Sequence, residues 1–300
     1  MPAPASVTAP WSSGNEPPRT SLPLGATDCH FHIYDGRVPS RPGTPHHPDA
    51  LEEDYRALQR RLGLSRGVLV QPSAYGTDNT RHLQALDILG RDSFRMVAVV
   101  EPSISDTTLR SLDEAGVRGI RFNLTMPGVL TALDLEGFGA RLADLGWHVQ
   151  LNASGPQIVD MEPVLAGLPC RLVLDHLAQV PQPEGLDSAA FPVVRRLLDG
   201  GRTWVKISGA YIRSRVGPPS YADAGRVASA LARAAPERLL WGSDWPHPTQ
   251  PTSSKPDDAS LLDLSEAWVA SPSAWHRALV DNPAELYGFF SAPIREEPGA

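Results

Sequence analysis

The feature that most constrains the fold is an alternation of short apolar runs with longer amphipathic stretches, repeated from residue 25 onward. Most runs are apolar on both faces, as expected for strands buried between a barrel core and outer helices. The eight runs cover residues 26–34, 66–73, 94–102, 117–124, 147–154, 170–177, 203–211 and 238–246. Stretches with apolar residues at helical spacing lie between and after them, at 49–64, 78–89, 105–116, 135–146, 155–167, 191–201, 222–236, 260–270 and 273–290.

Eight strands alternating with about eight helices, without a break in composition, predict a single (β/α)8 TIM-type barrel over residues 25–290. The length of 300 residues suits one such barrel. A doubly wound open sheet is the alternative, and a glycine-rich phosphate loop after the first strand would be its best mark. Residues 30–43 occupy that place and contain no G-x-G-x-x-G.

The two ends of the chain differ from the repeat in composition. Residues 1–24 are rich in Pro, Ser and Ala, which predicts a flexible N-terminal arm, and residues 291–300 are expected to be a frayed tail. The N-terminus lacks the basic head and apolar core of a secretory signal. Two cysteines, Cys29 and Cys170, form no disulfide framework, so we expect a reducing, cytoplasmic location.

Composition and charge narrow the class of partner. The chain is 41% hydrophobic and 20% charged, which is typical of a globular protein, and its net charge of −7 argues against a nucleic-acid surface. No run approaches the roughly 20 apolar residues of a membrane span. A small anionic ligand stays compatible with this charge, because a local arginine cluster can reverse the field in one cleft. A homo-oligomer is also left open.

Active sites of this fold lie at the C-terminal ends of the strands. His30 and His32 end the first strand, and alternation points both the same way, with Cys29 and Phe31 opposite. The other strand ends carry Ser73 and Tyr75 (second), Arg121 and Asn123 (fourth), Asn152 (fifth), His176 (sixth), Tyr211, Arg213 and Arg215 (seventh), and Asp244 and His247 (eighth).

Each of these residues also has a simpler structural interpretation. The His30 and His32 pair could be hydrogen-bonded loop residues, Asp244 could cap a turn, His176 could be a core histidine, and Arg121 could form an ion pair. These interpretations depend on the fold, however. If the chain is a barrel, the residues meet at one mouth, and a shared functional site becomes the better explanation.

With these residues in view, the chain resembles the amidohydrolase superfamily. Within it, the chain is most similar to the branch of 2-pyrone-4,6-dicarboxylate lactonases and related sugar-acid and muconolactone lactonases. The matching stretches run in the expected order from residue 26 to 290: "TDCHFHIYD", "RGVLVQPSAYGTDN", "GIRFNL", "LVLDHLA", "WVKISGAY", "WGSDWPHP" and "DNPAELYGF". The resemblance implies a somewhat distorted barrel and an enzyme that hydrolyses a lactone ring.

The resemblance also implies catalytic roles for the strand-end residues. Asp244 matches the family aspartate that activates water. His30, His32 and His176 match the histidines that gather near the scissile carbonyl and would polarise it. Losing one such hydrogen-bond donor typically lowers the rate by ~10²–10³.

Substrate contacts are implied in the same way. Arg121 and Arg213 match arginines that bind substrate carboxylates, as the forked guanidinium favours. Ser73 and His247 match further substrate contacts, and Asn152 is placed with them. We therefore expect a small anionic lactone or carboxylic acid as substrate.

Many amidohydrolases hold a divalent ion, and this sequence departs from their ligand set. The fourth strand carries Arg121 and no lysine, which excludes a lysine-carbamate-bridged binuclear centre, because Lys206 lies in the seventh strand. Asn152 ends the fifth strand where a histidine would serve, and an amide is a poor zinc ligand beside imidazole. We expect no cofactor. The alternative is one divalent ion, zinc above others, at His30, His32, His176 and Asp244.

Three rival functions share the barrel. One is a metal-dependent decarboxylase of an aromatic or muconate-type acid, which needs a bound ion. Another is a lactone isomerase, which would move the acyl group between hydroxyls with the same proton-handling residues. The third is an inactive barrel that only binds a partner, although such a protein would be expected to have lost some of these residues.

Overall fold

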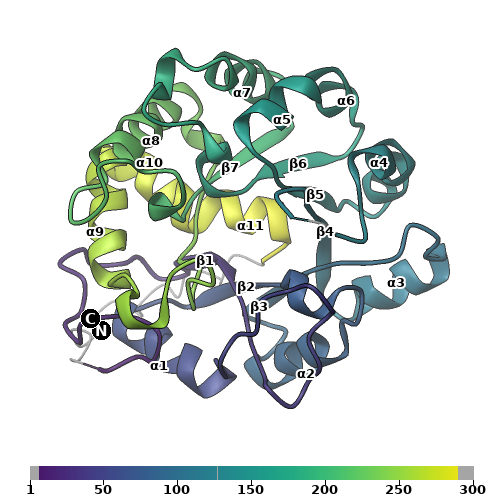
Figure 1. Cartoon of the computed structure of the whole chain (residues 1–300), viewed down its shortest axis with the longest axis horizontal. Helices are drawn as coiled ribbons and strands as arrows, with labels where there is room; N and C mark the ends of the chain where they lie inside the picture. Colours follow the sequence, from purple (N-terminus) through teal and green to yellow (C-terminus); the bar gives the residue numbers. More distant parts are fainter. Residues whose placement is uncertain (1–6, 127, 290–300) are drawn as a thin grey trace, which may run out of the picture.

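The computed structural model describes residues 7–126 and 128–289. Eight parallel strands form one sheet in the order β1 to β8, and helices surround it (Figure 1). The strands are β1 (Thr27–Phe31), β2 (Arg66–Val70), β3 (Phe94–Ala98), β4 (Val117–Asn123), β5 (His148–Asn152), β6 (Arg171–Leu174), β7 (Thr203–Ile207) and β8 (Leu239–Trp241). Each lies inside one of the eight predicted runs, so the predicted barrel is confirmed.

The helices follow the amphipathic stretches. They are α1 (Glu52–Leu62), α2 (Thr80–Leu89), α3 (Asp106–Glu114), α4 (Leu135–Asp144), α5 (Gly155–Asp160), α6 (Glu162–Gly167), α7 (Ala190–Asp199), α8 (Ala222–Ala234), α9 (Asp258–Val269), α10 (Pro272–His276) and α11 (Asn282–Tyr287). The stretch 155–167, predicted as one helix, is two, because Pro163 stands at the start of the second and favours a break. Among the described residues, no helix is long and apolar enough to cross a membrane.

The barrel is nearly closed where its last strand meets its first. The backbone N–H of His32 donates to the Trp245 carbonyl (2.8 Å), and that of Asp244 donates to the His30 carbonyl (2.8 Å). Below them, the buried Asp28 carboxylate accepts hydrogen bonds from the backbone of both His30 and Ser243, each 3.0 Å long. These bonds hold the ends of the two strands, and therefore His30 and Asp244, side by side.

A bulge in β1 changes one prediction. Asp28 pairs with Gly67 and Phe31 with Leu69, so β1 has one more residue than β2 between these pairs. A bulge of this kind turns two successive side chains to the same side of a sheet. Cys29, predicted to face away from the histidines, instead packs with Val68 and other strand residues of the inner core. That prediction was wrong, whereas Phe31 does face outward and stacks on Tyr55 of α1.

Helix α11 covers the end of the barrel where the strands begin (Figure 1). The Arg95 guanidinium on β3 donates to the Gly288 carbonyl (2.9 Å), and the Asn282 amide donates to the Leu239 carbonyl at the start of β8 (2.8 Å). The ring of His148, the first residue of β5, contacts the Tyr287 ring edge-on at 5.3 Å. The opposite end, where the strands terminate, is therefore the one that can take a ligand.

Several residues of the predicted N-terminal arm make hydrogen bonds to the barrel. The fully buried Arg61 of α1 donates to the Glu16 carbonyl (2.8 Å) and to the Ser12 hydroxyl (3.1 Å). The Trp245 indole donates to the Pro10 carbonyl (2.8 Å). A buried guanidinium needs several acceptors, and the arm supplies them. Residues 1–6 and the predicted tail 291–300 lie outside the described residues.

Candidate active site

A cavity of about 370 Å³ opens at the C-terminal ends of the strands. Seven of the nine predicted site residues line it: His32, Ser73, Arg121, Asn152, His176, Arg213 and Asp244. His30 is fully buried directly beneath the others, and His247 also lies outside the lining. The long loop after β1 contributes Thr44, Pro45 and His47 to the cavity wall.

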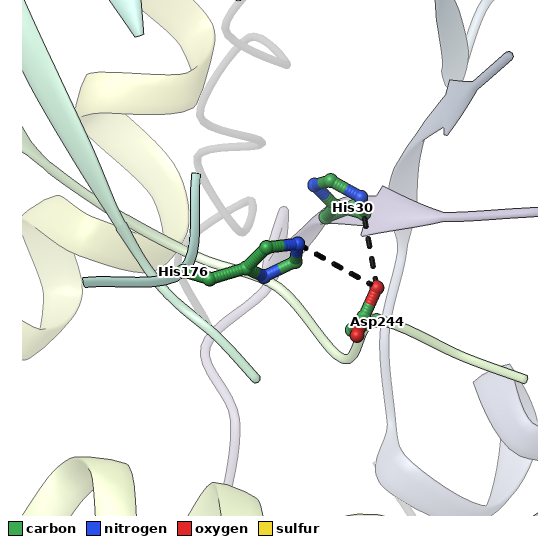
Figure 2. A group of neighbouring side chains, drawn as sticks. All are labelled: His30, His176 and Asp244. Atoms are coloured by element: carbon green, nitrogen blue, oxygen red, sulfur yellow. Dashed lines mark ion pairs between the residues drawn. The ribbon is translucent and has the colours of Figure 1, made fainter. Parts of the chain in front are cut away.

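Three imidazoles face one carboxylate oxygen at the floor of this cavity. Asp244 Oδ1 lies 3.7 Å from Nε2 of His30, 3.7 Å from Nε2 of His32 and 3.9 Å from Nε2 of His176. Figure 2 shows His30 and His176 pointing at the carboxylate from two sides. The backbone of His176 (φ 51°) and of Asp244 (φ 61°) is left-handed, an uncommon conformation for non-glycine residues that clusters at functional sites. The structure therefore brings the four predicted catalytic residues together.

Tyr211 holds the other oxygen of that carboxylate. Its hydroxyl donates to Asp244 Oδ2 (2.7 Å) and lies 2.8 Å from Nδ1 of His247. Nε2 of His247 in turn lies 3.0 Å from Oδ2 of the buried Asp258. His247 was predicted to contact the substrate, which stays a prediction. In the structure its ring is fully buried and its two nitrogens lie at hydrogen-bond distance from Tyr211 and Asp258. The sequence places Tyr211 at a strand end, but nothing there indicates its bond to Asp244.

The two histidines of β1 are held neutral by their surroundings. Burial and then the positive charge of the nearby Lys206 lower the pKa of His30 to about 3. Burial and the neighbouring His30 hold the pKa of His32 well below its ordinary value. Nδ1 of His32 lies 2.7 Å from the Val70 carbonyl, which can only accept, so this nitrogen carries the proton.

A buried polar cluster that sequence reasoning missed lies under His30. Lys206 Nζ is 2.7 Å from Gln150 Oε1, 3.2 Å from His30 Nδ1 and 3.4 Å from Asp175 Oδ1. Gln150 Nε2 also donates to Asp175 Oδ2 (3.1 Å). Burial raises the pKa of Asp175, but the neighbouring Lys206 and His30 outweigh this effect and hold the pKa well below its usual range. The alternation of β5 could have indicated part of this cluster, because Gln150 stands two residues before Asn152, a predicted strand-end residue.

Arg121 extends from β4 to the cavity, and most of its guanidinium N–H groups make no hydrogen bond among the described residues. Among the described residues, its guanidinium makes one hydrogen bond, from Nη1 to the Gln71 carbonyl (3.3 Å). Nε lies 3.6 Å from Asp175 Oδ2, too far for a good hydrogen bond, and is itself buried. A buried guanidinium with unused N–H groups is suited to bind an anionic ligand.

A row of amides also lines the cavity and ends at the second arginine. Arg213 Nε donates to Gln179 Oε1 (2.9 Å), and the Gln179 amide donates to Asn152 Oδ1. Asn152 Nδ2 donates to Asn123 Oδ1 (3.1 Å), and Asn123 Nδ2 donates to the Ser73 hydroxyl oxygen (2.8 Å). Because Ser73 accepts from Asn123, its own O–H is free to donate into the cavity.

A known protein family matches most of this chain. Residues 27–289 match the family model described as amidohydrolase, which is nearly the whole described chain. The chain belongs to the amidohydrolase family. The family resemblance read from the sequence is thereby confirmed.

Three curated relatives of this amidohydrolase are named as enzymes that act on lactones. It is 35% identical to a 4-sulfomuconolactone hydrolase from Rhizobium radiobacter over 89% of this chain and 91% of that one. It is 33% identical to a 2-pyrone-4,6-dicarboxylate hydrolase from Comamonas testosteroni, over 92% and 94% of the two chains. It is 31% identical to a D-galactarolactone isomerase from Agrobacterium fabrum, over 90% and 93%.

A solved structure supports the architecture independently. An Agrobacterium tumefaciens protein, solved without ligand, superimposes with a TM-score of 0.86 at 30% identity. The match covers 94% of this amidohydrolase and 99% of the solved chain. The two chains therefore share the barrel over 94% of this amidohydrolase.

Three of the predicted catalytic residues of this amidohydrolase lie close enough together to hold a metal ion. Donor atoms of His30, His176 and Asp244 all lie within 4.8 Å of one another. Zinc with bonds of ~2.0–2.1 Å places neighbouring tetrahedral ligand atoms about 3.3 Å apart, so these side chains could hold an ion after small shifts. A fifth-strand ligand is missing, because Asn152 uses its oxygen to accept from Gln179.

Proposed function

We propose that this amidohydrolase opens the ring of a small carboxylated lactone by hydrolysis, without a bound metal. One observation carries the proposal: Asp244 Oδ1 stands within 3.9 Å of three imidazole nitrogens, at the floor of a cavity lined by two arginines. A carboxylate base, imidazoles beside it and cationic anchors are the groups that an anionic lactone requires.

The reaction follows from the two carboxylate oxygens of Asp244. Tyr211 occupies Oδ2, so Oδ1 is the one available to take a proton from water. The water oxygen bonds to the lactone carbonyl carbon, and the carbonyl oxygen gains the negative charge beside the imidazoles. The ring C–O bond then breaks, and the proton held by Asp244 passes to the leaving oxygen. The product is the ring-opened acid.

Two arginines divide the recognition of the substrate. Arg121 is nearly buried beside the histidines, whereas Arg213 is exposed at the rim and held by Gln179. A carboxylate on the ring would pair with Arg121, and a second acidic group would reach Arg213. The names of two relatives, a sulfomuconolactone hydrolase and a pyrone-dicarboxylate hydrolase, support an anionic lactone of this kind.

The proposal that no metal takes part in the reaction is argued from the residues at two strand positions. The strand-four position carries Arg121, and the strand-five position carries an asparagine whose oxygen already accepts a hydrogen bond. If an ion did bind, His30, His176 and Asp244 would hold it, and it would polarise the carbonyl as a Lewis acid. We further propose a cytoplasmic location, because both cysteines are free thiols in the structure.

A lactone isomerase is the second candidate, because a relative at 31% identity bears that name. Asp244 would then take its proton from a hydroxyl of the substrate, which attacks the carbonyl in place of water. The product would be a ring of different size with the same mass. A decarboxylase would instead release carbon dioxide and need the ion.

A panel of lactones tests the proposal. Sulfo- and carboxylated lactones, matched neutral lactones and a sugar-acid lactone are incubated with protein of measured metal content, with and without chelator. We expect ring opening of the anionic lactones at equal rates in both conditions, with the product heavier by one water. Loss of activity with chelator would overturn the metal-free mechanism, and an isomeric product would favour the isomerase.

A further inference from the structure

We propose that Lys206 keeps the proton of His30 on Nε2, so that His30 is the hydrogen-bond donor of the first-strand pair and His32 is the acceptor. Lys206 is thus a positioning residue that assigns opposite roles to two histidines only two residues apart. The inference deepens the proposed function and rests on it for its catalytic consequence, but not for the proton positions themselves.

The first line of argument comes from Lys206. Its side chain is fully buried, and its ammonium group offers three donors and no acceptor. Three acceptors surround it: Gln150 Oε1 at 2.7 Å, His30 Nδ1 at 3.2 Å and Asp175 Oδ1 at 3.4 Å. If Nδ1 of His30 offers its lone pair, each of the three ammonium protons has an acceptor. The proton of the neutral ring then sits on Nε2.

The second line of argument comes from His32 and is independent of the lysine. Its Nδ1 must donate to the Val70 carbonyl at 2.7 Å, so the Nε2 of a neutral His32 can only accept. Nε2 of His30 and Nε2 of His32 lie 3.3 Å apart at hydrogen-bond geometry. With no ion between them, one of the two must donate, and only His30 is able to. Both arguments therefore place the proton on the same atom.

The opposite arrangement is the one a metal would need. His30 Nδ1 would have to donate to Asp175 Oδ1, which is 3.3 Å away and has no hydrogen-bond partner among the described residues. Nε2 of His30 and of His32 would then face each other as two lone pairs, which only a cation between them would stabilise. The spacing of the cluster suits an ion, but the proton pattern set by Lys206 does not.

The consequence for the reaction is a division of labour. When a lactone binds, Nε2–H of His30, 3.7 Å from Asp244 Oδ1, exchanges its bond to His32 for one to the lactone oxygen as charge develops, and this frees Nε2 of His32. Nε2 of His32, at the same distance from Asp244, accepts the second hydrogen of the attacking water. We expected all three imidazoles to polarise the carbonyl. In this proposal His30 and His176 keep that role, and His32 orients the water.

Nitrogen NMR of the histidine rings in the ligand-free protein tests the proton positions directly. The His30 signals are those that disappear in His30→Gln. We expect the wild type to show His30 protonated on Nε2 and His32 on Nδ1. A wild-type His30 protonated on Nδ1 in metal-free protein would overturn the proposal, whether or not any variant folds.

Two variants separate the lysine from general disturbance of the buried cluster. Lys206→Met removes the donor to His30, whereas Gln150→Met disturbs the same cluster and leaves that donor in place. We expect Lys206→Met to move the His30 proton to Nδ1 and to bind zinc roughly 10- to 100-fold more tightly, while Gln150→Met keeps the wild-type proton pattern. Equal behaviour of the two variants would overturn the role of Lys206. Because neither readout uses a lactone, a failure of the proposed function would show separately, as correct tautomers without turnover.

Discussion

The Tyr211 hydroxyl donates a 2.7 Å hydrogen bond to Oδ2 of Asp244. This bond, together with the backbone bond from Asp244 N–H to the His30 carbonyl, fixes the plane of the carboxylate. Oδ1 is then the oxygen that faces the histidines. Burial, and then the charge of Asp244, hold the pKa of Tyr211 well above its ordinary value, so the phenol stays a donor.

Tyr211→Phe should therefore lower kcat more than it raises KM. Loss of a hydrogen bond to a buried charged group costs about 1–3 kcal/mol, which corresponds to roughly 10- to 100-fold in rate. Steady-state kinetics on the best anionic lactone measures the effect. Tyr221→Phe removes the same atom from a ring that lies outside the cavity lining and should keep the wild-type kcat. Equal kcat values for both variants would contradict the role given to Tyr211.

Arg121 should discriminate lactones by charge. Arg121→Lys keeps the positive charge but loses the fork that binds a carboxylate through two parallel hydrogen bonds. We expect kcat/KM for a carboxylated lactone to fall by about 10- to 100-fold, because a hydrogen bond to a charged group contributes roughly 1.5–3 kcal/mol. The matched neutral lactone serves as the control, and its kcat/KM should change little. A similar loss for both substrates would mean that Arg121 acts only through the fold.

Much of this arrangement could be predicted from the sequence, because it depends on local pattern. Strands of a parallel barrel are buried on both faces, so runs such as 66–73 stand out from the amphipathic stretches around them. Once the barrel was assumed, the strand ends pointed to His30, His176 and Asp244, although these residues are far apart in the chain.

The rest depended on contacts that leave little trace in the sequence. One extra residue in β1 turned Cys29 inward, and a single-residue bulge does not disturb the apolar pattern. The N-terminal arm has the composition of a flexible segment, yet Arg61 binds it through several carbonyl and hydroxyl groups. The bond between Tyr211 and Asp244 joins two loops and appears only after folding.

Buried neutral histidines should make the fold sensitive to acid. Burial lowers the pKa of His82 from its ordinary 6.5 to about 3, and neither ring nitrogen has a hydrogen-bond partner among the described residues. Between these two pH values the unfolded chain binds a proton at this position that the folded chain does not. The unfolding free energy therefore falls as the pH drops from 6.5 toward 3, by about 1.4 kcal/mol per pH unit for this group.

His82→Phe should remove that contribution. The free energy of unfolding of the variant should rise relative to that of the wild type, by up to about 1.4 kcal/mol for each pH unit below 6. Urea unfolding at pH 7, 6 and 5, followed by circular dichroism, gives the comparison. Leu86→Val, a change in the same helix without a titrating group, should shift the unfolding free energy equally at every pH. Parallel curves for His82→Phe and the wild type would show that His82 does not titrate in this way.

Single-turnover kinetics of Asp244→Asn in protein of verified metal content tests the central claim most directly. The amide keeps the shape of the side chain but cannot take a proton from water, so ring opening should slow by roughly 10²–10⁴-fold. Asp113→Asn, the same change beside Trp147 on a residue outside the cavity lining, should keep the wild-type rate. An Asp244→Asn protein that opens the lactone at a near-wild-type rate would contradict the proposal that Asp244 is the base.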